Sequence, residues 1–250
     1  MRFHIAAFLL IASAAPGRAQ SADQLSLADK EYSALNASGA LSLYEKVLTA
    51  DPRNFEALWK ASRSAVDIGS YSPDAAKRSA LFSSAEQYAR RALILNPGDP
   101  EGHFALARAL GKTALTQSPR GRVKYATEIR SQALECLKLD SKNGGCLHVM
   151  GMWNAEVMRL SGLTRMLAKN FLGGKTFGSA SWKDAVSYME RSVASDPQRI
   201  VHHLDLAGVY RDTGDKARER SELDAVIRLP VADVNDRHYK DEARAELAGI

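Results

Sequence analysis

The sequence has little cysteine, no regular alternation of apolar and polar residues, and no long apolar run after its first fifteen residues. Two cysteines among 250 residues are too few for a small disulfide-framework protein or for a four-cysteine zinc site. The missing alternation argues against a β-sheet. No stretch after the first fifteen residues approaches the roughly 18 uncharged apolar residues of a membrane-spanning helix.

The overall composition is that of a globular protein, with 45% hydrophobic and 25% charged residues. Lysine and arginine number 34 against 29 acidic residues, and this net charge of +5 is too small to indicate a nucleic-acid partner. The composition therefore predicts a globular body that does not bind nucleic acid.

The first nineteen residues resemble a secretory signal peptide. Arg2 gives a positive start, residues 5–15 carry no charge, and Pro16 to Ala19 supply a break and small residues before a cleavage site. The uncharged run is too short to span a bilayer as a helix. We therefore expect residues 1–19 to be removed and the protein to be periplasmic or secreted, with no transmembrane segment in the mature chain.

Five segments share one ending, in which an amphipathic run stops at Asp-Pro or an equivalent turn. The stops fall at positions 52, 97, 141, 197 and 230, which are 45, 44, 56 and 33 residues apart. Proline lacks a backbone donor and restricts the residue before it, so a helix ends there. Intervals in this range are typical of stacked helical hairpins.

After each of the first four stops, apolar and small residues recur with the i, i+3, i+4, i+7 spacing of one buried helix face. The small member of each set lets two helices approach closely, and the whole pattern is that of tetratricopeptide repeats. The segment 208–230 is its clearest copy, with Gly214 ending one helix and Asp215 capping the next. The four faces are Leu58, Ala61, Ser62 and Ala65; His103, Leu106, Ala107 and Leu110; Leu147, Met150, Gly151 and Asn154; and His203, Leu206, Ala207 and Tyr210.

The pattern predicts an all-α protein, a tetratricopeptide-like superhelix of about five α-α hairpins, an insertion helix and a C-terminal capping helix. The body forms one domain over 20–250, with an insertion at 163–181. Ser72 and Ser118, each followed by proline, are expected to cap helices. The predicted helices are 24–36, 40–50, 54–69, 73–95, 99–115, 119–139, 144–161, 181–194, 199–212, 216–228 and 235–248.

The segments CLHVMGMWNAEVMRLSGLTRMLAKNFLGG (146–174) and SWKDAVSYMERSVASDPQRIVHHLDLAGVYRDTGDKARERSELDAVIRLPV (181–231) carry a more specific resemblance. The Gly-Met-Trp helix, the insertion and the closing Leu-Pro-Val are similar to the regulator of microtubule dynamics family. The resemblance covers about 145–240 and extends to 24–140 at the level of the repeats. It implies a helical-repeat domain whose activity is protein association, with microtubules in eukaryotic members.

No motif points to catalysis, a metal or a cofactor. Gly173 to Thr176 is similar to the end of a phosphate-binding loop, but Lys169 stands where that motif needs glycine, and a helix rather than a strand is expected before it. The histidines lack metal-ligand spacing, and no nucleophile elbow occurs. We therefore predict a non-enzymatic protein with no cofactor.

Cys136 and Cys146 lie on either side of a predicted helix-helix turn. Antiparallel helices bring such positions together, and an oxidising compartment would allow a disulfide. The alternative is that both are small buried apolar residues.

The first helix of each hairpin is expected to line a concave wall, and the spacing from each stop selects the side chains that face inward. Two aromatic residues beside two arginines would suit an acidic or carboxylate-bearing peptide, because guanidinium groups bind carboxylates in a bidentate way. The alternative is that the aromatic residues pack between hairpins and the arginines are solvated. The predicted binding residues are Trp59, Arg63, Phe104, Arg108, Lys112, His148 and Met152.

Three functions are compatible with this sequence. The first is an exported scaffold that binds another protein through the concave face. The second is a carrier that encloses a lipid or another apolar ligand, reached under the insertion residues Met166, Leu167, Phe171 and Leu172. The third is an enzyme whose site the spacing does not reveal. An open charged groove would favour the scaffold, and an apolar tunnel would favour the carrier. A cleft that holds titratable groups with strongly shifted pKa values would favour the enzyme.

Overall fold

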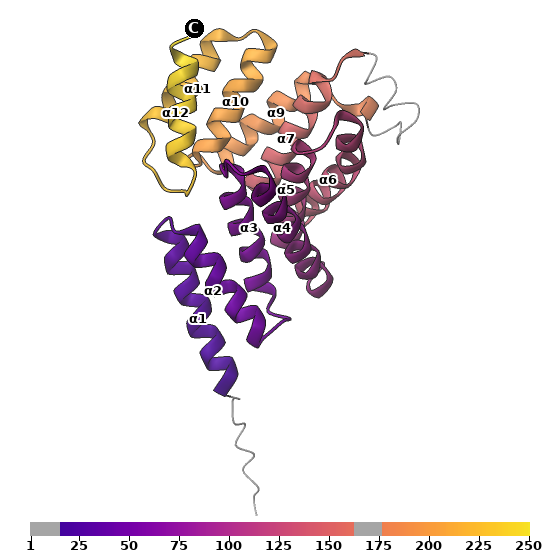
Figure 1. Cartoon of the computed structure of the whole chain (residues 1–250). Coiled ribbons are helices and arrows are strands. Elements are labelled where there is room, and N and C mark those ends of the chain that lie inside the picture. Colours follow the sequence, from indigo (N-terminus) through magenta and orange to yellow (C-terminus); the bar gives the residue numbers. More distant parts are fainter. Residues whose placement is uncertain (1–15, 163–176) are drawn as a thin grey trace, which may run out of the picture.

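A computed structural model of the chain describes residues 16–162 and 177–250, and all regular structure in those two ranges is helical (Figure 1). The predicted all-α class is confirmed. The elements are α1 (Pro16–Ser33), α2 (Ala37–Ala50), α3 (Phe55–Ser70), α4 (Ala75–Leu95), α5 (Pro100–Leu115), α6 (Pro119–Leu139), α7 (Gly144–Arg159), the 3-10 turn η1 (Phe177–Ser179), α9 (Trp182–Ser195), α10 (Ile200–Thr213), α11 (Lys216–Arg228) and α12 (Asp236–Leu247).

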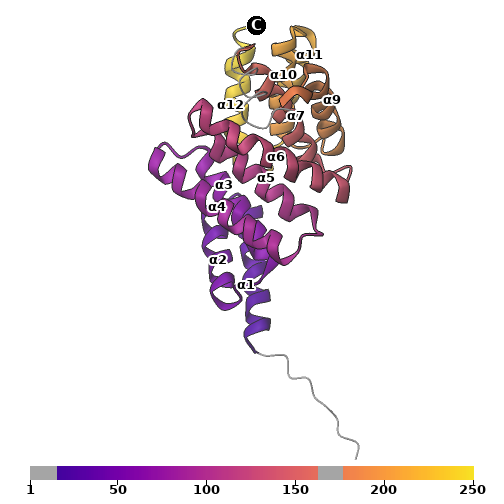
Figure 2. The same cartoon turned by 90° about the vertical axis from the view of Figure 1, so that its right-hand side faces the viewer.

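The helices pair in chain order as antiparallel hairpins. Within the described ranges α1 packs on α2, α3 on α4, α5 on α6, α7 on α9 and α10 on α11, and each hairpin also contacts the next. The two views in Figures 1 and 2 show this succession from the N-terminal hairpin to α12. The arrangement is the tetratricopeptide-like stack that the repeat spacing predicts.

The turns between hairpins end one helix and cap the next within a few residues. Asn54, Asp99 and Asn143 precede α3, α5 and α7, and each side-chain oxygen accepts a hydrogen bond from a backbone N–H of the first turn. Gly214 ends α10 with a φ of 81°, which a residue without a Cβ adopts at little cost, and Asp215 caps α11 as predicted.

Two predicted helix starts are wrong. The N-cap of α4 is Asp74, not Ser72, because the Asp74 carboxylate accepts from the N–H groups of Ala76 and Lys77. The first predicted helix, 24–36, runs instead from Pro16 to Ser33, and Asn36 caps α2 through the N–H of Gly39. Ser118 caps α6 as predicted.

All sixteen residues of the four predicted faces are buried. The small positions matter because neighbouring helices come close there. A Cβ on Gly151 of α7 would lie 2.5 Å from Cγ of Met189 in α9, so a larger residue at this position would push the two helices apart. The small residue at position 151 therefore determines how closely α7 and α9 pack.

The C-terminal helix does more than cap the last hairpin. It packs on α10 and α11 as predicted, and its N-terminal end also meets α3, far away in sequence. The ring of His238 stacks on Tyr71 with centroids 4.1 Å apart, and the Tyr71 hydroxyl donates to Glu242 at 2.7 Å. This contact joins the end of the second hairpin to the C-terminal helix.

The predicted insertion, 163–181, lies largely outside the described residues. Its described end contains η1, and Phe177 there is buried against Trp153 of α7, with the ring centroids 6.2 Å apart. This end of the insertion therefore packs against the inner helices. No helix in the described ranges combines the length and the apolar character that crossing a bilayer requires.

Candidate functional site

Two adjoining cavities open on the inner side of the stack. The larger has a volume of about 330 Å³ and is lined by residues of α5, α6, α7, α10 and α12 together with Phe177. The smaller, of about 20 Å³, lies between α3 and α5. Phe104 and Arg108 line both cavities, so the two cavities lie side by side and together make up the candidate site.

The structure places all seven predicted binding residues on these walls. Trp59 and Arg63 line the smaller cavity, and Lys112, His148 and Met152 line the larger one. They come from α3, α5 and α7, the first helices of three successive hairpins. The repeat spacing therefore selected residues that lie along two adjoining cavities.

Arg108 is engaged with partners inside the protein. Its guanidinium donates to the carboxylate of Asp67 at 2.5 Å, and the Tyr32 hydroxyl donates to the other oxygen of that carboxylate at 2.7 Å. Asp67 is 1% exposed. The backbone oxygen of Asp67 also accepts from the side chain of Asn235 at 3.1 Å. Arg108 therefore neutralises a buried acid that joins α1, α3, α5 and the C-terminal segment.

Arg63 makes contacts of a different kind. Its guanidinium lies 3.6 Å from the centroid of the Tyr32 ring and 5.3 Å from that of Trp59. No carboxylate of the described residues forms an ion pair with it. Stacking on aromatic faces holds the guanidinium in place, and Glu101, which lines the same cavity, interacts with its charge without forming an ion pair.

Lys112 is the second cation of the site without an ion pair to a described carboxylate. It lies one turn after Arg108 on α5 and is partly buried in the wall of the larger cavity. Burial lowers the pKa of Lys112, and the nearby charge of Arg108 lowers it further. Both effects disfavour the charged amine, so a bound anion would relieve an unfavourable electrostatic environment.

A histidine pair forms another part of the polar wall. His148 Nε2 lies 2.7 Å from the Asp205 carboxylate, and its ring stacks on that of His202 with centroids 4.9 Å apart. Burial, together with the charges of His148 and Arg199, lowers the pKa of His202 to about 2. His202 is therefore neutral in the folded protein near neutral pH.

We expect His202 to make folding sensitive to acid. The unfolded histidine takes up a proton below about pH 6.5, whereas the folded one stays neutral, so stability falls as pH drops below that value. Between pH 8 and pH 5 this group costs about 2 kcal/mol of unfolding free energy. The measurement is urea unfolding of the wild type and His202→Gln at both pH values. Between pH 8 and pH 5 the variant should lose about 2 kcal/mol less unfolding free energy than the wild type.

His203 supplies the matched control with the opposite sign. Although burial acts to lower its pKa, the hydrogen bonds to Glu222 and to the carbonyl of Pro197 outweigh it, and the net shift is upward. Its stabilising effect is present below the unfolded pKa and is lost as pH rises. His203→Gln should therefore lose more unfolding free energy between pH 8 and pH 5 than the wild type does. The same pH dependence of unfolding free energy in His202→Gln and His203→Gln would contradict the opposite roles of the two histidines.

The rest of the larger cavity has an apolar wall. Trp153 is buried there, and its indole N–H donates to the backbone oxygen of Ala126 at 2.7 Å. This bond satisfies the polar atom of the ring and fixes its apolar face. The apolar lining includes Ala114, Ala126, Ile129, Trp153, Val157 and Phe177.

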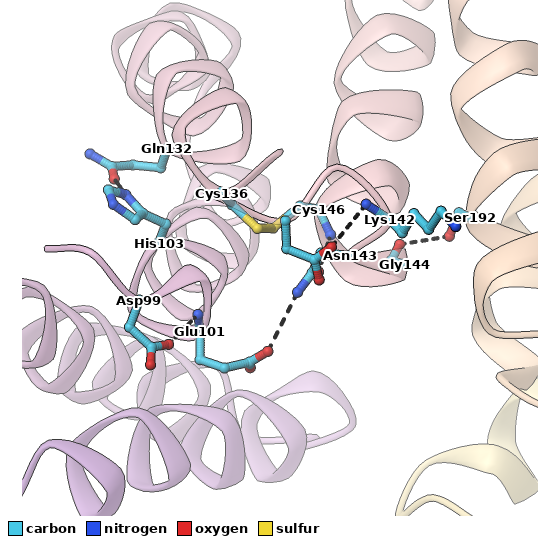
Figure 3. Close-up of a disulfide and its surroundings, with 11 residues drawn as sticks. Asp99, Glu101, His103, Gln132, Cys136, Lys142, Asn143, Gly144, Cys146 and Ser192 are labelled. Atoms are coloured by element: carbon cyan, nitrogen blue, oxygen red, sulfur yellow. Dashed lines mark hydrogen bonds between the residues drawn. A yellow bond between two sulfur atoms is a disulfide. The ribbon is translucent and has the colours of Figure 1, made fainter. Parts of the chain in front are cut away.

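A disulfide supports the α6–α7 turn next to this site (Figure 3). The structure has Cys136 and Cys146 bonded to each other, at the end of α6 and the start of α7. Asn143 in the same turn caps α7 and reaches Glu101, which lines the smaller cavity. The disulfide thus holds the start of α7 in place beside the candidate site.

The sequence reasoning missed several residues of the site. Asp67 and Tyr32 were not singled out, and Tyr239 reaches the larger cavity from α12. Asp67 follows Arg63 by one helical turn, as Lys112 follows Arg108, and this spacing was the available signal for Asp67. Among the residues that the structure describes, no group of three or more potential metal ligands occurs. The glycine-lysine segment 173–176 and the four insertion residues named for the carrier lie outside the described residues.

The comparisons with known proteins agree with this architecture. A family model described as regulator of microtubule dynamics protein 1-3 matches residues 19–250. The chain belongs to this family. Its curated members include regulator of microtubule dynamics protein 1 of Bos taurus, 24% identical over 197 residues, which are 78% of this chain and 62% of the relative.

Regulator of microtubule dynamics protein 3 of Xenopus laevis is 22% identical over 198 residues, 79% of this chain and 42% of the relative. The chain thus spans less than two thirds of the length of both relatives. A thermophilic TPR protein of Thermus thermophilus has a similar fold, with a TM-score of 0.65, 16% identity, and coverage of 90% of this chain and 99% of that one.

Proposed function

We propose that this family member is an exported, non-enzymatic scaffold that binds another protein through its concave face. The ligand is an acidic or carboxylate-bearing peptide segment. The observation that carries the proposal is that seven residues chosen from three repeats line two adjoining cavities. The signal-peptide layout of residues 1–19 supports export to the periplasm or beyond.

The chemistry of the smaller cavity supports an acidic peptide. Arg63 forms no ion pair with a described carboxylate, although Glu101 lines the same cavity, and Trp59 beside it offers a flat apolar surface. An arginine held on aromatic rings has few conformations to lose when it binds a carboxylate. Arg108, already paired with Asp67, contributes shape and rigidity to the wall.

A pair of matched peptides tests this proposal. A fluorescein-labelled decapeptide rich in glutamate, with one leucine, is titrated by anisotropy against the same peptide with glutamine at every acidic position. We expect the acidic peptide alone to bind, and Arg63→Gln to weaken it roughly tenfold, the value of one charged hydrogen bond. Arg53→Gln, an exposed arginine just before α3, is the control that leaves affinity unchanged. Equal binding of both peptides, or no effect of Arg63→Gln, would overturn the proposal.

A second candidate is a carrier of a lipid or another apolar ligand. The continuous apolar wall around Trp153 and Phe177 favours it, because a protein surface used only for charged peptides does not require such a lining. Binding of a neutral apolar probe in the larger cavity would support the carrier.

A further inference from the structure

The larger cavity has an apolar part and a cationic part within a small volume. About 330 Å³ lies near the lower end of the ~300–1,000 Å³ typical of small-molecule sites. Its wall combines the rings of Trp153 and Phe177 with charged side chains from four helices. A cavity of this size accommodates one compact organic molecule.

The charges in this wall do not balance. Arg108 is paired with Asp67, and Arg199 with Asp233. The two lining carboxylates are also engaged, since Asp205 bonds His148 and Glu156 bonds Arg159. Two lining cations remain without an ion pair to any described carboxylate, namely Lys112 and Arg122.

Lys112 is the better anchor of the two. Arg122 is exposed and donates to the backbone oxygen of Gln117, whereas Lys112 is partly buried and has no hydrogen-bond partner within the described ranges. The charged groups acting on Lys112 are Arg108 on its own helix and, more distantly, Asp205, Asp67 and Glu242. These three carboxylates are bonded to other residues or lie on distant helices. None of them neutralises the Lys112 amine, which can therefore bind an anion.

We propose that the larger cavity binds one compact organic monoanion, with its carboxylate on Lys112 and a ring or short branched chain against Trp153 and Phe177. This inference rests on the carrier function and names the ligand class for it. Charge complementarity selects an anion, since the site holds two cations in excess among its described residues. The volume selects a compact body rather than a two-chain lipid.

The test compares three probes of one shape with the purified full chain. They are 3-phenylpropionate, its neutral amide and the corresponding amine, titrated by isothermal calorimetry, with tryptophan fluorescence as a second signal. We expect the carboxylate to bind roughly ten- to a hundredfold more tightly than the amide, and the amine not to bind. Myristate is included to test a long-chain acid.

Variants assign this selectivity to one residue. Lys112→Gln should remove the preference for carboxylate over amide, and Lys112→Arg should keep it. Lys138→Gln, an exposed lysine paired with Glu135, is the control that changes neither affinity. A preference that survives Lys112→Gln would overturn the proposal.

The outcomes separate this inference from the carrier function. Equal binding of carboxylate and amide leaves a carrier but overturns the anion site. Binding of myristate alone overturns the compact ligand class and leaves a long-chain carrier. If no probe binds while the acidic peptide does, both the carrier and this inference are wrong and the scaffold stands.

Discussion

Replacing Arg108 with methionine should lower the free energy of unfolding by about 3–5 kcal/mol, because it leaves the buried carboxylate of Asp67 without its cation. Asp67 would keep the Tyr32 hydroxyl as a donor, which supplies no charge. Urea unfolding followed by circular dichroism measures the change. A loss below about 1 kcal/mol would contradict this account of the pair.

Two controls separate the buried charge from the loss of side-chain contacts. Arg244→Met removes a guanidinium from the exposed pair with Asp241, and we expect a change of no more than about 1 kcal/mol. The double variant Asp67→Leu, Arg108→Met removes both charges together. It should recover most of the lost stability, since replacing a whole buried ion pair by apolar residues is often neutral.

The same contact links the wall of the site to the closure of the stack. Asp67 accepts from Tyr32 of α1 and Arg108 of α5, and its backbone oxygen accepts from Asn235 just before α12. One residue of α3 therefore joins the first and third hairpins and the segment before the C-terminal helix. Arg108→Met acts on stability at the point where the two cavities meet, so its effect on peptide binding is interpretable only beside the double variant.

The repeat spacing was enough to predict the hairpins because their cause is local. Each stop is a proline or an equivalent turn, and each buried face follows from the helical period, so neighbouring residues in the sequence decide both. The same spacing placed Arg63 and Lys112 on the inner wall. What a side chain does there depends on other repeats, and the spacing does not contain that information.

Arg108 illustrates this limit. Its place on the wall follows from its position in α5, but its partner Asp67 lies 41 residues away on a different hairpin. The contact of Tyr71 with α12 spans 171 residues and depends on the curvature of the complete stack. Curvature sums small rotations between repeats, and no single segment of the sequence specifies it.

Removing the disulfide by Cys136→Ala and Cys146→Ala together should lower the free energy of unfolding by about 3 kcal/mol. The bond joins residues ten positions apart, and closing a loop of this length restricts the unfolded chain by that amount in the chain-entropy model. Both side chains are fully buried, so each alanine also loses the packing of one sulfur atom, which adds to this effect. Urea unfolding with and without reductant measures the effect.

Reductant provides the decisive comparison, because it should lower the stability of the wild type to about that of the double variant and leave the variant unchanged. Two thiols that react in the folded, unreduced protein would contradict the bond. Since the bond holds the start of α7 beside Asn143 and Glu101, the double variant should also bind the acidic peptide less tightly. That loss would come from a less ordered wall, and it should therefore be smaller than the loss from Arg63→Gln, which removes the binding charge itself.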